Sequence, residues 1–223
     1  MEAASTRDQL PVGAGTPADP PTPSRQRIRA GAIASLLAIA LPLTGLISLL
    51  LRSQLDPHFE NYRLHFLLFG LVGTVAFVLG FAAGEAANRR GDARVLLLSL
   101  AFMATGGFMG LHALGTPGVL FTGDHSGFKV AIPVGLLVSA GFAAASAFVD
   151  LRPGFGALAI RHRRALRVSV LLAMAGWLLW TVANLPPLDG AEGEAARGVL
   201  LTALAIIGTI VYAASAARYW TIF

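Results

Sequence analysis

The apolar residues of this chain occur in blocks of about 20, and this grouping constrains the fold more than any other feature. Six such blocks, separated by short polar segments, cover residues 30–51, 64–87, 95–114, 130–149, 168–185 and 199–217. A helix rises 1.5 Å per residue, so about 20 residues cross the roughly 30 Å of hydrocarbon in a bilayer. The core of a water-soluble protein would be divided into shorter pieces. The sequence therefore predicts an all-α integral membrane bundle of six transmembrane helices.

The composition agrees with lipid as the main solvent. Only 13% of the residues are charged and the mean hydropathy is +0.68, whereas about a quarter of the residues are charged in soluble domains. The net charge of +5 would suit nucleic acid, but the basic residues lie in short clusters at the ends of the apolar blocks. That placement is typical of topology signals and of contacts with anionic lipids. We therefore expect the lipid bilayer as partner and no nucleic acid.

The positions of the arginines predict the orientation of the helices. Residues 1–26 are rich in Pro, Ala, Thr and Gly, so we expect a disordered cytoplasmic tail, followed by a six-helix transmembrane domain over residues 27–223. One side of the bundle has twelve basic residues: Arg25, Arg27, Arg29, Arg89, Arg90, Arg94, Arg152, Arg161, Arg163, Arg164, Arg167 and Arg218. The other side has four: Arg52, Arg63, Lys129 and Arg197. Because cytoplasmic loops are enriched in Lys and Arg, the sequence predicts a multi-pass protein of the cell membrane with both termini in the cytoplasm.

Four of the five histidines fall on the predicted outer side. His58 and His125 lie in outer loops, His65 at the outer start of the second predicted helix, and His112 at the outer end of the third. Imidazole is the commonest metal ligand and suits zinc, copper, nickel and haem iron. We therefore predict a candidate transition-metal or haem site built from His65 and His112, with His58 or His125 assisting.

Other interpretations of these histidines stay open. Carboxylates nearby, at Asp56, Glu60 and Asp124, would complete a metal site or orient a ring. Histidine is also at home at a membrane interface with no ligand at all, and the sequence has no short zinc motif such as HExxH. Without a metal, imidazoles that titrate near neutral pH would sense acid.

The predicted spans have no ionisable residue near their centres. Glu85, Asp92, Arg94 and Asp150 all lie at or near helix ends, and Glu85 is expected to pair with Arg89. Ion-coupled transporters usually need an ionisable residue within the bundle, which disfavours that function but not a path for a neutral solute lined by hydroxyls. The sequence has no cysteine, and it shows no phosphate-binding glycine loop or catalytic triad, so we expect no enzymatic activity.

Glycines predict a close contact between the second and third helices. Gly80 and Gly84 in the second helix, and Gly106 and Gly110 in the third, are spaced four residues apart. Such pairs of small residues let two helix backbones approach closely. We therefore expect these two helices to pack tightly against each other.

Three stretches carry a resemblance to a known kind of membrane region. They are LHFLLF at 64–69, RRGDARV at 89–95 and LHALGTPGVL at 111–120. They resemble the multi-pass membrane region ahead of the catalytic domain in some actinobacterial and related adenylate/guanylate cyclases, best over the first four predicted helices. The resemblance implies a sensory or anchoring role and makes His65 and His112 part of the motif. The sequence contains no cyclase domain, so we expect either a stand-alone relative or a piece of a longer protein.

These observations favour an extracytoplasmic signal-sensing or membrane-anchoring module without catalytic activity of its own. Three alternatives remain: a metal- or haem-binding membrane protein that uses the outer histidines, a small transporter for a neutral solute, and a structural subunit of a membrane complex. A transition metal or haem would be the cofactor of the first. Another membrane subunit or a cytoplasmic effector would be the partner of a sensor or a subunit.

Overall fold

The computed structural model describes residues 61–121, 125–185 and 193–222, together with residues 36, 37, 40, 41, 43–45, 47, 48, 51 and 52. From residue 61 onward the elements are α2 (Tyr62–Arg90), α3 (Ala93–Leu114), α4 (Ser126–Ala147), the short 3-10 helix η2 (Val149–Leu151), α5 (Phe155–Arg161), α6 (Arg163–Val182) and α7 (Gly193–Ile222). These residues form helices and turns with one isolated bridge, between Pro117 and Phe121, and no strand. The predicted all-α class is confirmed.

Within the described residues, five helices are long and apolar enough to cross a membrane. They are Tyr62–Arg90, Ala93–Leu114, Ser126–Ala147, Arg163–Val182 and Gly198–Ile222, and they correspond to the second to sixth predicted spans. The first predicted span, 30–51, lies largely outside the described residues, although the positions described within it are helical. The count of six helices is therefore not confirmed. The predicted tail, 1–26, also lies outside the described residues.

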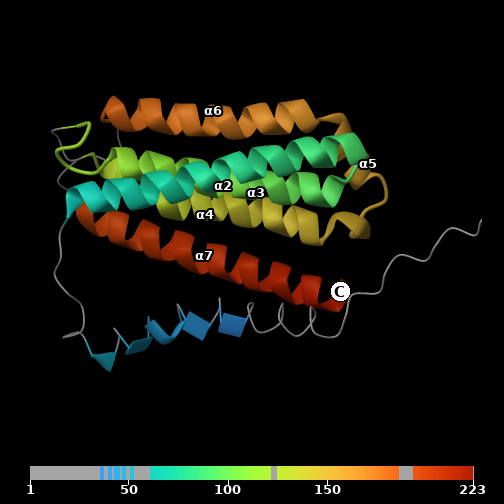
Figure 1. Cartoon of the computed structure of the whole chain (residues 1–223), viewed down its shortest axis with the longest axis horizontal. Helices are drawn as coiled ribbons and strands as arrows, with labels where there is room; N and C mark the ends of the chain where they lie inside the picture. The colour runs from blue at the N-terminus through green and yellow to red at the C-terminus, as the bar shows by residue number, and fades with distance from the viewer. Residues whose placement is uncertain are drawn as a thin grey trace, which may run out of the picture. The chain divides into compact units, whose positions relative to one another are not determined.

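Residues 1–59 and 60–223 form two compact units, and the bundle from α2 to α7 belongs to the second. In Figure 1, α2, α3 and α4 lie at the centre, with α6 along one side and α7 along the other. The core follows α3, where Leu100, Met103 and Ala104 are at most 1% exposed and pack with Val170 of α6. Many leucines of α2 face outward instead, such as Leu71 with 66% of its surface exposed. In a bundle that spans a membrane, lipid solvates such a surface.

The connection between α2 and α3 is set by two residues. Gly91 ends α2 in a left-handed conformation, with a φ of 67°, which glycine adopts without steric cost. The side chain of Asp92 then caps α3 by accepting a hydrogen bond of 3.0 Å from the Val95 amide. Because this turn is so short, α2 and α3 are antiparallel neighbours.

The contact between α2 and α3 runs along a row of glycines, which we call the glycine seam: Gly73, Gly80 and Gly84 of α2 with Gly106 of α3. A β-carbon added at Gly106 would lie 2.6 Å from the Gly73 carbonyl oxygen, and one at Gly80 would lie 2.9 Å from the Ser99 carbonyl oxygen. Backbones this close require the absence of a side chain. The predicted tight packing of these two helices is confirmed.

Two pairs of hydroxyl groups fix α4 against α7. Ser139 bonds to Tyr212 and Ser146 bonds to Tyr219, each with 2.5 Å between the oxygens. Both pairs repeat at seven residues in both helices, which is the register of two parallel helices packed side by side. The serines are buried, so these bonds satisfy hydroxyls that no water reaches.

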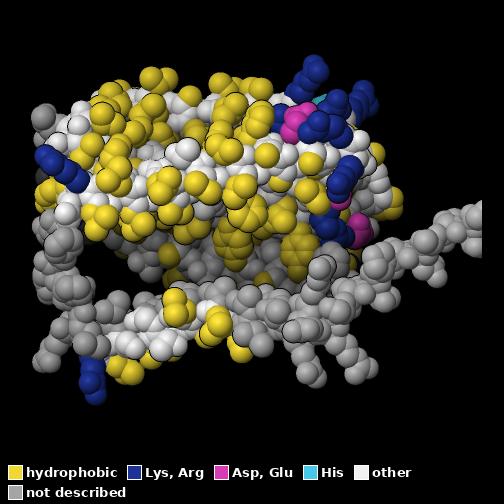
Figure 2. Space-filling model, in the orientation of Figure 1, with side chains coloured by type: hydrophobic (Ala, Val, Ile, Leu, Met, Phe, Trp, Pro, Cys, Tyr) yellow, Lys and Arg dark blue, Asp and Glu magenta, His cyan; other side chains and the backbone are white. Residues whose placement is uncertain are grey.

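The two ends of the bundle differ in chemistry. We call one the arginine end, since most of its charges come from Arg89, Arg90, Arg94, Arg152, Arg161, Arg163, Arg164 and Arg167. Figure 2 shows a group of basic side chains at the place where α2 ends and α6 begins in Figure 1, next to a band of hydrophobic side chains over the middle of the helices. The opposite end carries His65, His112 and His125, and we call it the histidine end. His162 lies at the arginine end.

Ion pairs link helices at the arginine end. The carboxylate of Glu85 in α2 accepts a hydrogen bond of 3.3 Å from Arg167 in α6. The sequence spacing predicted that Glu85 pairs with Arg89 in the same helix, but the structure pairs it across helices. Arg94 at the start of α3 pairs with Asp150 in η2 and lies 5.8 Å from the ring centre of Tyr219. These contacts fasten α2, α3, α6 and α7 at one end.

Candidate functional site

The candidate site lies at the histidine end, where three segments of the chain meet. His65 is in the first turn of α2, which the side chain of Asn61 caps by accepting a bond of 3.0 Å from the Leu64 amide. His112 is in the last turn of α3. The two helices are antiparallel neighbours, so the start of one and the end of the other bring these histidines to the same depth.

The rings of His65 and His112 are in contact. Their centres are 5.3 Å apart with an interplanar angle of 65°. Phe69, one turn after His65, packs against both, with centre-to-centre distances of 4.6 Å to His65 and 5.2 Å to His112. The predicted pairing of these two histidines across neighbouring helices is therefore what the structure contains.

A backbone carbonyl holds the ring of His112. The Nδ1 atom of His112 is 2.9 Å from the carbonyl oxygen of Phe128 in α4. A carbonyl oxygen only accepts hydrogen bonds, so Nδ1 carries a proton and donates it. In the neutral ring, Nε2 then holds the lone pair. Metal-binding histidines are typically oriented in this way, by a bond from the second ring nitrogen to a carbonyl or carboxylate.

The ring of His65 is held in a similar way. Its Nδ1 atom is 3.1 Å from the hydroxyl oxygen of Thr116, in the turn after α3. Thr116 is only 2% exposed, so the hydroxyl is fixed by its surroundings. Within the described part of the chain, neither histidine uses Nε2 in a hydrogen bond. When Nδ1 of His65 donates to the Thr116 hydroxyl, as Nδ1 of His112 does to its carbonyl, the pair offers two nitrogen atoms to a ligand, from two different helices.

The structure places His125 in a separate cluster. Its Nδ1 atom is 2.8 Å from the amide oxygen of Asn184, just after α6, and its ring packs against Phe121 and Phe128 at 5.4 and 5.8 Å between centres. Phe128 connects the two clusters, because its carbonyl binds His112 while its ring touches His125. His125 is thus a neighbour of the pair through Phe128.

The first turn of α4 is the common support of this end. Besides the contacts of Phe128, the carbonyl of Gly127 accepts a bond of 3.0 Å from the indole nitrogen of Trp177 in α6. A β-carbon at Gly127 would lie 2.2 Å from the hydroxyl oxygen of Thr181, so α6 approaches the α4 backbone closely here. The ring of His112 is anchored to this rigid turn.

The structure describes only some of the residues of the predicted metal site. His58 lies outside the described residues, as do Asp56, Glu60 and Asp124. Among the described residues, no three His, Asp or Glu side chains are grouped closely enough to hold a metal ion. The described chain thus supplies two imidazoles, and a metal or haem at this place stays a prediction.

Sequence reasoning missed the groups that orient the rings. Thr116, the Phe128 carbonyl and Asn184 were not among the predicted residues. Thr116 lies four residues after His112 in the sequence, and this closeness was the one available signal for it. A backbone carbonyl carries no such signal, because every residue has one.

Comparison with known proteins found no matching family model, no matching characterised protein and no matching solved structure. The part of the fold that the structure describes is all-helical, and its five long apolar helices are consistent with the class of multi-pass membrane proteins.

Proposed function

We propose that the chain is a multi-pass membrane sensing module, without catalytic activity of its own, whose input site is the pair of His65 and His112. The observation that carries the proposal is the geometry of this pair. Two imidazoles from different helices are in contact, and each is anchored through Nδ1, so that each Nε2 is available. In the proposed orientation the histidine end faces outward, because loops rich in Lys and Arg, such as those of the arginine end, usually lie on the cytoplasmic side of the membrane.

The ligand that suits this pair best is a transition-metal ion that prefers imidazole, such as Zn²⁺, Cu²⁺ or Ni²⁺. Two histidines alone are an incomplete set, since zinc usually takes four ligands. Water, or side chains such as the predicted His58, would supply the rest.

The proposed response starts from the relative position of α2 and α3. A ligand that bridges His65 and His112 stabilises one arrangement of these helices over others, and it shifts the equilibrium by its difference in affinity. The glycine seam brings the two backbones into close contact, so a shift of one helix is passed to the other along the seam. At the arginine end, Glu85 connects α2 to Arg167 of α6, and that contact is where a cytoplasmic partner would detect the change.

Metal binding tests the input site. We expect the full chain, purified in detergent without chelators and then dialysed against zinc, copper or nickel, to hold about one ion per chain by elemental analysis. His112→Ala removes one of the two nitrogen ligands and should weaken binding at least about tenfold. His162→Ala is the matched control, because this exposed histidine lies at the arginine end and should leave the metal content unchanged. A wild-type protein that takes up none of these metals would contradict the metal form of the proposal.

A distance measurement tests whether binding is transmitted. The chain has no cysteine, so cysteines introduced at Arg90 and Trp220 can carry a pair of spin labels at the ends of α2 and α7. Both side chains are exposed. We expect the metal to move the distance between the labels by about 1–2 Å, and the change to vanish in the His112→Ala background. Metal binding with an unchanged distance would favour a metal-binding protein over a sensor.

A further inference from the structure

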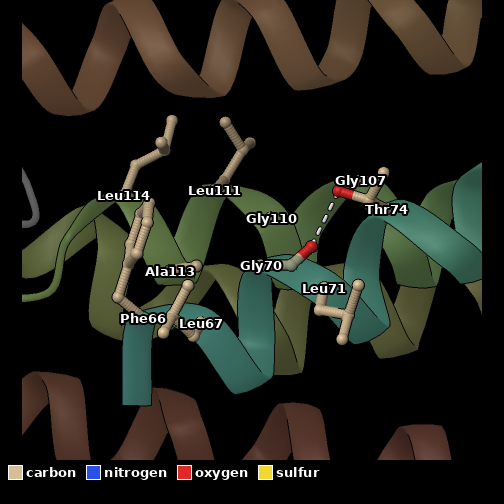
Figure 3. Close-up of a pocket in the computed structure, with 10 residues that line it drawn as sticks. All are labelled: Phe66, Leu67, Gly70, Leu71, Thr74, Gly107, Gly110, Leu111, Ala113 and Leu114. Carbon is tan, nitrogen blue, oxygen red and sulfur yellow. Dashed lines mark hydrogen bonds between the residues drawn. The ribbon is translucent and has the colours of Figure 1, made fainter. Parts of the chain in front are cut away.

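A groove of about 550 Å³ lies between α2 and α3, in the half of the bundle nearer the histidine end. Figure 3 shows its lining, which comes from α2 between Phe66 and Thr74 and from α3 between Gly107 and Leu114. The groove is separate from the pair of His65 and His112, since neither histidine lines it. Its volume is in the range of sites for small organic molecules.

Glycines create the space in this groove. A β-carbon added at Gly110 would meet nothing within 4 Å, and one at Gly70 would meet only the β-carbon of Ala113, at 3.9 Å. This contrasts with Gly106 in the seam, where a β-carbon would strike backbone atoms. On the same two helices, the groove therefore leaves room for a side chain, whereas the seam leaves none.

The lining of the groove is mostly apolar. The hydroxyl of Thr74 is the single polar side-chain group among the lining residues, and it donates a hydrogen bond of 2.7 Å to the carbonyl of Gly70, as Figure 3 shows. The other lining side chains are apolar, and Leu67 and Leu71 are more than 60% exposed. Water needs two or more polar partners to stay in a cavity, so an apolar occupant suits this groove.

The depth of the groove matches the acyl chains of one leaflet. From the first residue of α2, the segment Phe66 to Thr74 lies about 6 to 18 Å along the helix, and one leaflet contributes roughly half of the 30 Å hydrocarbon core. Arg63 comes one turn nearer the helix start, on the same helical face as Leu67 and Gly70, and it is exposed. Its guanidinium is thus at headgroup level, above an apolar groove, and guanidinium groups bind phosphate well.

We propose that this groove holds an acyl chain of a phospholipid from the leaflet at the histidine end, with the lipid phosphate bound by Arg63. A second copy of the chain fits less well. A symmetric dimer packed through this face would bring Arg63 of both copies to the same depth, where like charges repel. An anionic lipid pairs with that arginine instead.

Filling the groove tests the proposal. Gly110→Leu puts a side chain into open space and should block the acyl chain without disturbing the seam. Native mass spectrometry of the full chain, released from mild detergent with added phosphatidylglycerol, counts the retained lipids. We expect one phosphatidylglycerol to be retained about tenfold more weakly in Gly110→Leu than in the wild type. Gly176→Leu is the matched control, because a β-carbon at this exposed α6 glycine likewise meets nothing within 4 Å. It should retain lipid as the wild type does.

The headgroup contact is tested separately. Arg63→Gln should reduce the preference for phosphatidylglycerol over phosphatidylcholine while Gly110→Leu reduces the retention of both. Equal retention by Gly110→Leu and the wild type would overturn the proposal, as would an equal loss in Gly176→Leu. A dimer in the wild type that Gly110→Leu dissociates would overturn it in favour of a second copy.

Discussion

Replacing Gly106 with alanine is expected to destabilise the bundle by about 3 kcal/mol. The added β-carbon would lie 2.6 Å from both the carbonyl oxygen of Gly73 and the amide nitrogen of Phe77. These are backbone atoms of a neighbouring helix, so the whole of α2 must move to make room. The cost exceeds the gain of up to about 1 kcal/mol that alanine brings over glycine in a helix. Unfolding of the purified protein in mixed detergent micelles, followed by circular dichroism, measures the change.

Gly110→Ala is the control for this prediction. It lies one turn further along α3, and its added β-carbon would meet nothing within 4 Å. The same substitution should therefore leave stability unchanged or raise it slightly, through helix propensity alone. If Gly106→Ala were as stable as Gly110→Ala, the backbones of α2 and α3 could not approach as closely at the seam as the structure shows.

The sequence predicted the positions of the long helices well, because the length of an apolar block reports directly how many residues of a helix lipid can solvate. It predicted their ends less well. The second predicted span was 64–87, whereas α2 runs from Tyr62 to Arg90. Hydropathy marks the residues that lipid solvates, but a helix continues until a cap ends it, and here the cap is Gly91 in a left-handed conformation. Hydropathy likewise places the start of α4 too late. The helix starts at Ser126, ahead of the charged Lys129, whereas the predicted apolar block begins only at 130.

The short helix α5 had no such signal. It covers only Phe155–Arg161, about two turns, and its composition is mixed. It forms because the segment packs on the bundle, with Ala159 buried against Leu97 and Val149. A contact of this kind depends on the tertiary arrangement, which local sequence does not report.

The candidate site shows the same division. The depth of His65 and His112 followed from hydropathy, and the antiparallel turn of α2 and α3 made them neighbours, so their pairing could be predicted. The separation of His125 could not, because it depends on the path of the chain between α3 and α4. That path buries Thr116 beside His65 and places the first turn of α4 beside His112. In the seam, likewise, sequence spacing identified Gly106 but not Gly73 as its partner.

The second large effect that we expect comes from exchanging side-chain volume between Phe108 of α3 and Gly135 of α4. Phe108 of α3 is 2% exposed and fills the space left by Gly135 of α4, where a β-carbon would lie 2.3 Å from the Phe108 β-carbon. Phe108→Gly should cost about 4 kcal/mol, by leaving a cavity and by placing a glycine inside a helix. Gly135→Leu should cost a similar amount by overpacking.

Together these two substitutions should cost much less than the sum of their separate effects, because glycine at 108 removes the β-carbon that a side chain at 135 would strike, and the leucine occupies the space that the phenylalanine leaves. A double-mutant cycle on unfolding free energies in detergent should give a coupling of about 2 kcal/mol. Gly141→Leu provides the control on the same helix, since a β-carbon at this exposed glycine meets nothing within 4 Å. Combined with Phe108→Gly, its effect should be additive. An additive result for Gly135→Leu as well would mean that Phe108 does not pack against this turn of α4.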